Sequence, residues 1–181
     1  EHNVVAGYIQ GAEPKGELKE SGPSAVVDVT NGEMIDGGEG NHIDTIYNLA
    51  ALLSVVAESK PKLAWKIGID GLWNVLEVAR EQGCAVFTPS SIGSFGASTP
   101  HTQTPQDTIQ RPRTMYGVTK VTTELLSDYY LTNTVLTHVL SVSRASFERD
   151  PPGGGTTDYA VDYLLFGIKK VRKFVLPYTK K

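Results

Sequence analysis

The chain is poor in cysteine and has no long apolar run. Its 181 residues include one cysteine, Cys84, so an internal disulfide is excluded and a reducing compartment is favoured. Cys84 lies in the apolar run 84–87, which favours core packing over a nucleophilic role. No stretch reaches the ~18 to 20 apolar residues that a membrane span needs. Without a visible signal peptide either, the sequence predicts no membrane partner and favours the cytoplasm.

The charge pattern is also weak. The formal net charge is -3, and basic residues cluster only near the end of the chain, between Lys169 and Lys181. Such a tail is typical of a solvated helix end, so no nucleic-acid partner is predicted. His101 and His138 have no neighbours at metal-ligand spacing, so no metal site is predicted. The hydrophobic content of 40% suits one globular domain with a substantial core.

Apolar patterning predicts alternating strands and helices. A broad apolar stripe over residues 62–82, stopped by Gly83, predicts the clearest helix. Trp65 and Trp73 lie in it and are expected to pack rather than to stack on a ligand. The remaining segments are expected strands at 3–6, 25–29, 44–50, 84–88 and 135–142, helices at 116–130 and 158–170, and a loop or weak helix at 30–42. This alternation predicts an α/β fold, a Rossmann-like doubly wound parallel sheet with helices on both faces.

In such a sheet, ligands bind at the carboxyl ends of the strands. Asp28, residues 50–54 and the pair Ser90 and Ser91 all follow predicted strands. Segments far apart in the sequence are therefore expected to meet at one edge of the sheet.

Tyr116 and Lys120 are the main catalytic candidates. Their i, i+4 spacing places both on one helix face, where an ammonium can lower the tyrosine pKa from near ~10. A serine hydroxyl from a strand end could hydrogen-bond a substrate oxygen, completing a proton-transfer site for an alcohol or a ketone. The spacing is common by chance, and an amphipathic helix start with an exposed lysine would explain it equally.

Four strings carry a resemblance to a known family. They are Ser-Ser-Ile-Gly-Ser-Phe-Gly at 90–96 followed by Tyr-Gly-Val-Thr-Lys at 116–120, Asn-Leu-Ala-Ala-Leu-Leu-Ser at 48–54, Thr-Ile-Gln-Arg-Pro-Arg-Thr-Met-Tyr at 108–116, and Pro-Gly-Gly-Gly-Thr-Thr-Asp-Tyr-Ala at 152–160. The first resembles the extended short-chain dehydrogenase/reductases, the NAD-dependent epimerase/dehydratase family. The other three are similar to the short-chain-type L-threonine 3-dehydrogenases within it.

The resemblance implies oxidation of L-threonine to 2-amino-3-ketobutyrate with NAD as cofactor. It implies that Tyr116 is the acid/base, that Lys120 holds the nicotinamide ribose, and that Ser91 orients the substrate hydroxyl beside Ser90. The other implied contacts are Asp28 and Val29 beside the adenine, Ala50, Ala51 and Leu52 along the cofactor, and Ser54 with Thr156 or Thr157 on the amino acid. It also implies a homodimer through the helices at 62–82 and 116–130, and a mitochondrial matrix location as the alternative to the cytoplasm.

Some of these positions have simpler explanations. Ser54 could be a helix cap or a turn residue, and Thr156 or Thr157 could cap the helix that follows the glycines. Arg111 and Arg113 could bind a carboxylate or simply face solvent.

The chain also departs from the family pattern. It begins at Glu1 without the family's Gly-rich strand and turn, which cradle the dinucleotide phosphates. Tyr8 stands where a ribose-binding acid is expected, and Gly68 where the family has asparagine. We therefore expect a truncated dinucleotide-binding domain at 1–150 and the start of a substrate-binding region at 151–181. Loss of a central strand is expected to leave the edges of its two neighbours unpaired.

Two alternatives follow. One is another extended short-chain enzyme, such as a nucleotide-sugar epimerase, which also uses serine and Tyr-x-x-x-Lys. The other is a catalytically inactive, truncated remnant.

Overall fold

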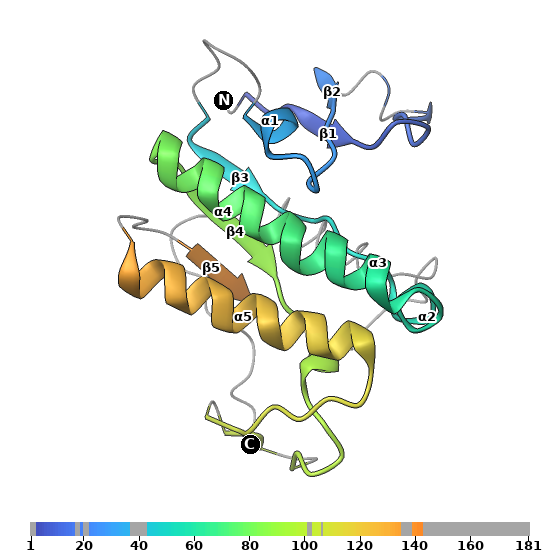
Figure 1. Ribbon diagram of the computed structural model, residues 1–181, viewed down its shortest axis with the longest axis vertical. Helices are drawn as coiled ribbons and strands as arrows, with labels where there is room; N and C mark the ends of the chain where they lie inside the picture. Colours follow the sequence, from blue (N-terminus) through green and yellow to red (C-terminus); the bar gives the residue numbers. More distant parts are fainter. Residues whose placement is uncertain are drawn as a thin grey trace. The chain divides into compact units, whose positions relative to one another are not determined.

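The strands of the described chain form two parallel sheets. The computed structural model describes residues 3–16, 19, 22–36, 43–100, 103–105, 107–134 and 139–142. Strands β1 (Ala6–Tyr8) and β2 (Ser24–Val26) pair with each other, and β3 (Thr45–Tyr47), β4 (Ala85–Pro89) and β5 (Val139–Val142) form a second sheet in that order. The parallel α/β architecture predicted from the sequence is confirmed, but β1 and β3 do not pair with each other (Figure 1).

The helix predicted at 62–82 is present in three parts. Helix α3 (Pro61–Trp65) leads into a π-helical turn (Lys66–Asp70) and then α4 (Gly71–Gln82). Gly83 ends the helix with a left-handed φ of 71°, a conformation that glycine adopts without strain. The π-helical turn was not predicted, because hydrophobic periodicity does not distinguish i→i+5 from i→i+4 bonding. Such turns are often found at functional sites.

Two other short helices lie on either side of β3 in the sequence. Helix α1 (Gly32–Ile35) falls within the predicted weak helix and is capped by the side chain of Asn31, which accepts from the Glu33 amide. Helix α2 (Ser54–Ser59) was not predicted, since its apolar residues follow no helical period. Leu53, not Ser54, is the N-cap residue of α2, so the capping explanation for Ser54 is wrong.

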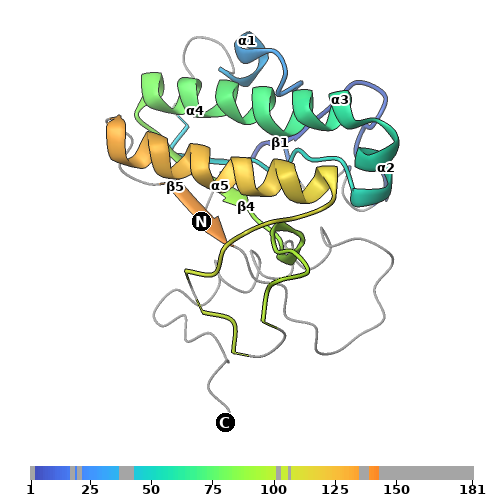
Figure 2. The same cartoon turned by 60° about the horizontal axis from the view of Figure 1, so that its bottom comes forward.

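Helix α5 (Met115–Asn133) lies beside α4 over the β3–β4–β5 sheet (Figures 1 and 2). The face of α5 that is buried carries small hydroxyl residues at i, i+4 and i+8, Thr119, Thr123 and Ser127. Each hydroxyl donates to a backbone carbonyl of the preceding turn, so these three buried hydroxyls are satisfied within the helix. These short side chains allow close packing: a Cβ on Gly68 would lie 3.3 Å from Thr119 Cβ.

The core lies between α4 and the sheet. Leu72, Val75 and Leu76 are almost completely buried, and Cys84 belongs to the same cluster, as its apolar run predicts. Burial raises the pKa of the Cys84 thiol, so it remains protonated. No helix within the described ranges combines the length and apolar character needed to cross a bilayer.

Candidate active site

The site is built where β4 ends. The chain leaves the sheet at Pro89 and turns into a single 3₁₀ turn (Ile92–Ser94), for which Ser91 is the N-cap residue. Ser91 Oγ accepts a 3.2 Å hydrogen bond from the Gly93 amide, and the Ser94 hydroxyl donates to the Ser91 carbonyl over 2.8 Å. The Ser91 side chain is therefore held in place at the carboxyl end of a central strand.

Gly93 brings Ser91 and Tyr116 together. A Cβ at this glycine would lie 3.1 Å from Tyr116 Cδ1 and 3.5 Å from Ser91 Oγ, so both side chains flank one point. The start of α5 comes equally close, because a Cβ on Gly117 would lie 2.2 Å from the Gly93 carbonyl oxygen. Two glycines thus permit the backbone approach that places the Tyr116 ring next to Ser91.

Lys120 lies one helical turn after Tyr116, as the spacing predicts. Its Nζ is 5.7 Å from the centre of the Tyr116 ring and donates a 2.6 Å hydrogen bond to the Pro89 carbonyl. Only 8% of Lys120 is exposed, which excludes the simple exposed lysine that the spacing also allowed. Burial lowers the Lys120 pKa to about 8, partly opposed by the negative charge of Glu124.

Ser90 has a hydrogen-bond partner on α5. Its hydroxyl donates to Glu124 Oε1, on α5 one turn beyond Lys120. The other carboxylate oxygen of Glu124 accepts a 2.7 Å bond from Gln110 Nε2, which also donates to Ser94 Oγ over 3.2 Å. The described geometry gives Ser90 a structural partner, and its predicted contact with substrate stays a prediction.

Two acceptors cap the N-terminus of α5, directly before Tyr116. Thr114 Oγ1 accepts from the Gly117 amide over 3.0 Å. Glu58 on α2 reaches across to accept from the Met115 amide over 2.5 Å. A carboxylate at this end of a helix is favoured by the helix dipole.

Asp28 and Val29 follow β2 at its carboxyl end. Asp28 Oδ1 accepts from both the amide and the hydroxyl of Thr30, over 2.9 and 2.8 Å, and these bonds lower the Asp28 pKa. Val29 is fixed against α4, since its carbonyl accepts a 2.9 Å bond from Asn74 Nδ2 and its side chain lies against Gly71. The predicted position of these residues at a strand end is confirmed, and their contact with adenine stays a prediction.

Residues 48–54 leave β3 at the same edge of their sheet. Asn48 is 7% exposed, and its Oδ1 accepts a 3.4 Å bond from the Ala50 amide. Ala50 and Leu52 are half-buried, whereas Ala51 and Ser54 are exposed. The segment is therefore surface-accessible in the described chain, as a ligand-lining loop would be.

Several predicted residues take no part in this geometry. Arg111 and Arg113 are exposed, in agreement with the solvent-facing alternative. Thr156 and Thr157, the predicted helix at 158–170, His101 and His138 lie outside the described residues.

Four residues of the site were missed at the sequence level: Asn48, Glu58, Gln110 and Glu124. Only Glu124 had a usable signal, since it continues the i, i+4 series of Tyr116 and Lys120. Glu58 and Gln110 act through contacts between distant segments, which spacing does not reveal. Asn48 bonds to the Ala50 amide two residues away, and no motif pointed to it.

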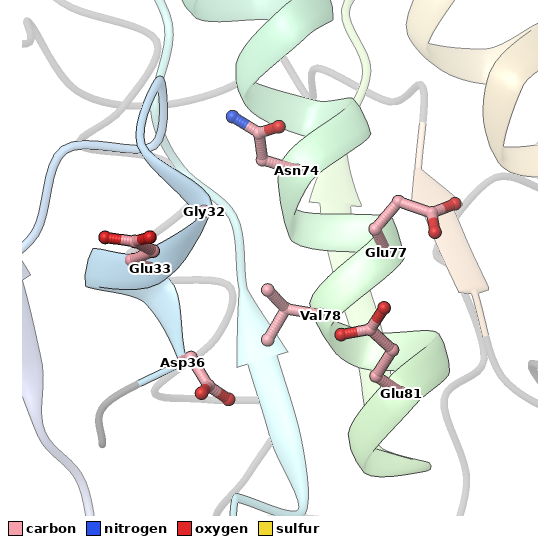
Figure 3. A pocket seen from close by; sticks show the side chains of 7 residues that line it. All are labelled: Gly32, Glu33, Asp36, Asn74, Glu77, Val78 and Glu81. Atoms are coloured by element: carbon pink, nitrogen blue, oxygen red, sulfur yellow. The ribbon is translucent and has the colours of Figure 1, made fainter.

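A separate pocket of about 260 Å³ lies between α1 and α4 (Figure 3). Its lining includes four carboxylates, from Glu33, Asp36, Glu77 and Glu81, and none of the candidate site residues. One of these, Glu77, has its pKa lowered by hydrogen bonds from Tyr130 and Arg80. In the described part of the chain, no group of three or more histidine, cysteine or acidic residues is arranged to hold a metal ion.

Residues 10–142 match the NAD dependent epimerase/dehydratase family. The chain belongs to this family. An uncharacterized epimerase/dehydratase of Staphylococcus haemolyticus is 47% identical over 172 residues, which make up 94% of this chain and 54% of that protein. The chain therefore spans about half the length of the curated relatives it matches. The Rossmann-like fold predicted from the sequence is confirmed.

Among solved structures, the chain is similar to L-threonine dehydrogenases. The L-threonine dehydrogenase of Clostridium difficile matches with a TM-score of 0.73 and 45% identity, over 92% of this chain and 53% of that one. The L-threonine dehydrogenase of Phytophthora infestans matches with a TM-score of 0.68 and 40% identity, over 84% and 51%. The UDP-glucose 4-epimerase of Brucella ovis, solved with NAD, is 17% identical and shares the fold alone.

Proposed function

We propose that this chain carries the proton-transfer half of an NAD-dependent L-threonine 3-dehydrogenase. The observation that carries the proposal is the grouping of Ser91, Tyr116 and Lys120 where β4 meets α5. The likeness to two L-threonine dehydrogenases at 40% identity or more supports threonine over a nucleotide sugar as the substrate. The reaction would oxidise the hydroxyl-bearing carbon of L-threonine, giving 2-amino-3-ketobutyrate.

Each of the three residues has a role that its surroundings support. Ser91 Oγ, held by the Gly93 amide, would hydrogen-bond the threonine hydroxyl. Tyr116 Oη would accept the proton that this hydroxyl loses as the carbon is oxidised. The Lys120 ammonium would favour negative charge on that oxygen, since it is buried and lies 5.7 Å from the centre of the same ring.

The residues present fit the nicotinamide end of the cofactor. In the part of the chain described, Lys120 Nζ has one hydrogen-bond partner, the Pro89 carbonyl. An ammonium has three N–H groups, so two are left to donate to the hydroxyls of a ribose. When bound, NAD would supply the hydride acceptor. Ala50, Ala51 and Leu52 after β3, and Asp28 and Val29 after β2, are proposed to line its remaining length.

Substrate recognition is proposed to involve Ser54, at the exposed start of α2, together with Ser90 and with Thr156 or Thr157. The domain division into a dinucleotide-binding part, 1–150, and the start of a substrate-binding part, 151–181, follows from the same resemblance. A homodimer in the cytoplasm or the mitochondrial matrix completes the proposal.

The test has two stages, because cofactor binding must precede turnover. Calorimetry with NAD comes first, and then NADH formation is followed with L-threonine. We expect binding, and turnover that Tyr116→Phe abolishes without abolishing binding, because this variant keeps the ring and loses only the hydroxyl. Thermal stabilisation by UDP-sugars but not by threonine would instead favour an epimerase. If the chain shows no NAD binding and no NADH formation, the proposal is overturned and an inactive remnant is favoured.

A further inference from the structure

Glu124 joins three segments that meet at the candidate site. Its Oε1 accepts from the hydroxyl of Ser90, in the loop after β4. Its Oε2 accepts from Gln110 Nε2, in the segment that leads to α5. Glu124 itself belongs to α5, so one half-buried carboxylate ties both loops to the helix that carries Tyr116 and Lys120.

The network continues to the backbone of Ser91. Gln110 Nε2 also donates to Ser94 Oγ, and the Ser94 hydroxyl in turn donates to the Ser91 carbonyl. Ser94 is completely buried, so its hydroxyl depends on these partners. Bonds in such a chain strengthen one another in a low-dielectric setting, and loss of one member leaves several groups unsatisfied.

The negative charge of the same carboxylate also acts on the Lys120 ammonium. Glu124 follows Lys120 by four residues, which places the two on one face of α5. Of the charged groups around α5 that are described, Glu124 is the one whose charge acts on Lys120. Elements that contact α5 carry other charges, on Glu58 of α2, Lys62 of α3, Lys66 and Asp70 of the π-helical turn, and Glu77, Arg80 and Glu81 of α4.

We propose that Glu124 is a positioning residue, which fixes the Ser90–Ser91 loop against α5 and keeps the buried Lys120 ammonium charged for the proposed dehydrogenase reaction. It does not touch substrate in this scheme. Its two functions are separable, because the hydrogen bonds hold the loop and the charge supports the ammonium. The inference rests on the proposed function for its purpose, but its physical content can be measured without cofactor or substrate.

The test uses the reactivity of Lys120 in the full chain. Competitive labelling with acetic anhydride, read by mass spectrometry, reports the neutral fraction of each lysine. In Glu124→Gln we expect Lys120 to be labelled about three- to tenfold faster near pH 7, because burial is no longer opposed by a carboxylate. Glu124→Asp, which keeps the charge, should return labelling toward the original rate. Asp128→Asn, one turn further on the same helix and exposed, is the matched control and should change nothing.

An unchanged Lys120 labelling rate in folded Glu124→Gln overturns the electrostatic part. If Glu124→Gln does not fold, Ser90→Ala and Gln110→Ala are used instead. Each removes one hydrogen-bond donor to Glu124 and leaves the charge of its carboxylate in place. Amide exchange at Gly93 and Ser94, both bonded to Ser91, should then be at least about threefold faster. Unchanged exchange in both variants would overturn the positioning role. Labelling as expected in a chain without NAD binding would refute the dehydrogenase proposal and leave the Glu124 inference standing.

Discussion

Lys120 Nζ donates a 2.6 Å hydrogen bond to the carbonyl of Pro89, the last residue of β4. This bond joins the second turn of α5 to the strand end from which Ser90 and Ser91 emerge. It also holds a lysine that is only 8% exposed, and burying a cation is costly unless partners compensate. The free energy of unfolding should therefore depend on the protonation of Lys120.

Replacing Lys120 by methionine should reveal this dependence. Burial lowers the pKa from 10.5 to about 8, so the folded state releases its proton at lower pH than the unfolded state does. Below about pH 8 both states are protonated and the folded chain bears the whole cost of burial. Between about pH 8 and 10.5 the unfolded state binds more protons, so stability rises with pH. Relative to Lys120→Met, the original chain should gain about 3 kcal/mol across that window.

Urea unfolding followed by the fluorescence of Trp65 and Trp73 measures this difference at a series of pH values. Lys66→Met removes an exposed lysine from the neighbouring π-helical turn and is the matched control. Its unfolding free energy should run parallel to that of the original chain. If the unfolding free energy of Lys120→Met also ran parallel to that of the original chain across this pH range, Lys120 would not be buried in solution.

The two glycines that bring Tyr116 next to Ser91 should respond very differently to alanine. At Gly93 the new Cβ would lie 3.1 Å from a ring carbon of Tyr116, and a ring can move by a few tenths of an ångström. At Gly117 the new Cβ would lie 2.2 Å from the backbone oxygen of Gly93 and 2.5 Å from Pro112 Cβ. We expect Gly93→Ala to cost less than about 1 kcal/mol and Gly117→Ala more than about 2 kcal/mol.

Thermal unfolding of both variants tests this order. Helix propensity alone predicts the opposite for Gly117→Ala, because alanine is favoured over glycine inside a helix by about 1 kcal/mol. A stabilised Gly117→Ala would show that the helix start and the 3₁₀ turn are further apart than described. If turnover is established, Gly93→Ala should reduce kcat about tenfold or more through displacement of the Tyr116 ring, with little change in KM.

Glu58→Ala should weaken the start of α5. The Glu58 carboxylate accepts from the Met115 amide, one of the donors that a helix start leaves without a partner. Loss of such a cap costs about 1 kcal/mol, to which the lost interaction with the helix dipole adds. Chemical denaturation gives the measurement, with Asp128→Ala, in the last turns of the same helix, as the control. Amide exchange that is faster at Met115 and unchanged at Tyr130 would locate the effect, whereas an equal loss of stability in both variants would argue against the cap.

Particular residues show how far the sequence alone reaches. The i, i+4 spacing of Tyr116 and Lys120 was enough to place them together, because a helix fixes that geometry by itself. Gly83 was likewise enough to end α4, through its left-handed backbone. The partner of Ser90 could not be found in this way, because Glu124 is 34 positions away and meets it only after the chain has folded.

The sheets show a different limit. Strand runs at both ends of the described chain were recognised to within a few residues, and every observed pairing is parallel. Pairing partners, however, are a property of tertiary structure. The β1–β2 pair is separate from β3–β4–β5 in the described chain. The segment after β2 is held to α4 by the bond between Asn74 and Val29 and by the packing of Val29 against Gly71. Trp65 and Trp73 are also more exposed, at 43% and 49%, than packing inside a helix suggested.

That exposure leads to a prediction about assembly. Trp73 contacts Tyr130 edge-on with ring centres 5.8 Å apart, and Tyr130 contacts Tyr129 at the same distance, so aromatic rings run from α4 onto α5. On α5, Leu125 and Tyr129 are 63% and 55% exposed and lie one turn apart. An apolar surface shared by two adjacent helices is typical of a face that a partner covers. We expect a homodimer through this face.

Sedimentation equilibrium should find a dimer for the original chain and a monomer for Leu125→Glu, since two carboxylates would be buried against each other's subunit. Ile109→Glu makes the same change at a residue that is 70% exposed outside the helices, and it should remain dimeric. A monomeric original chain at all concentrations would refute the dimer. A dimer that persists in Leu125→Glu would place the interface elsewhere, because a leucine at the centre of a packed interface cannot be exchanged for a carboxylate without loss of affinity.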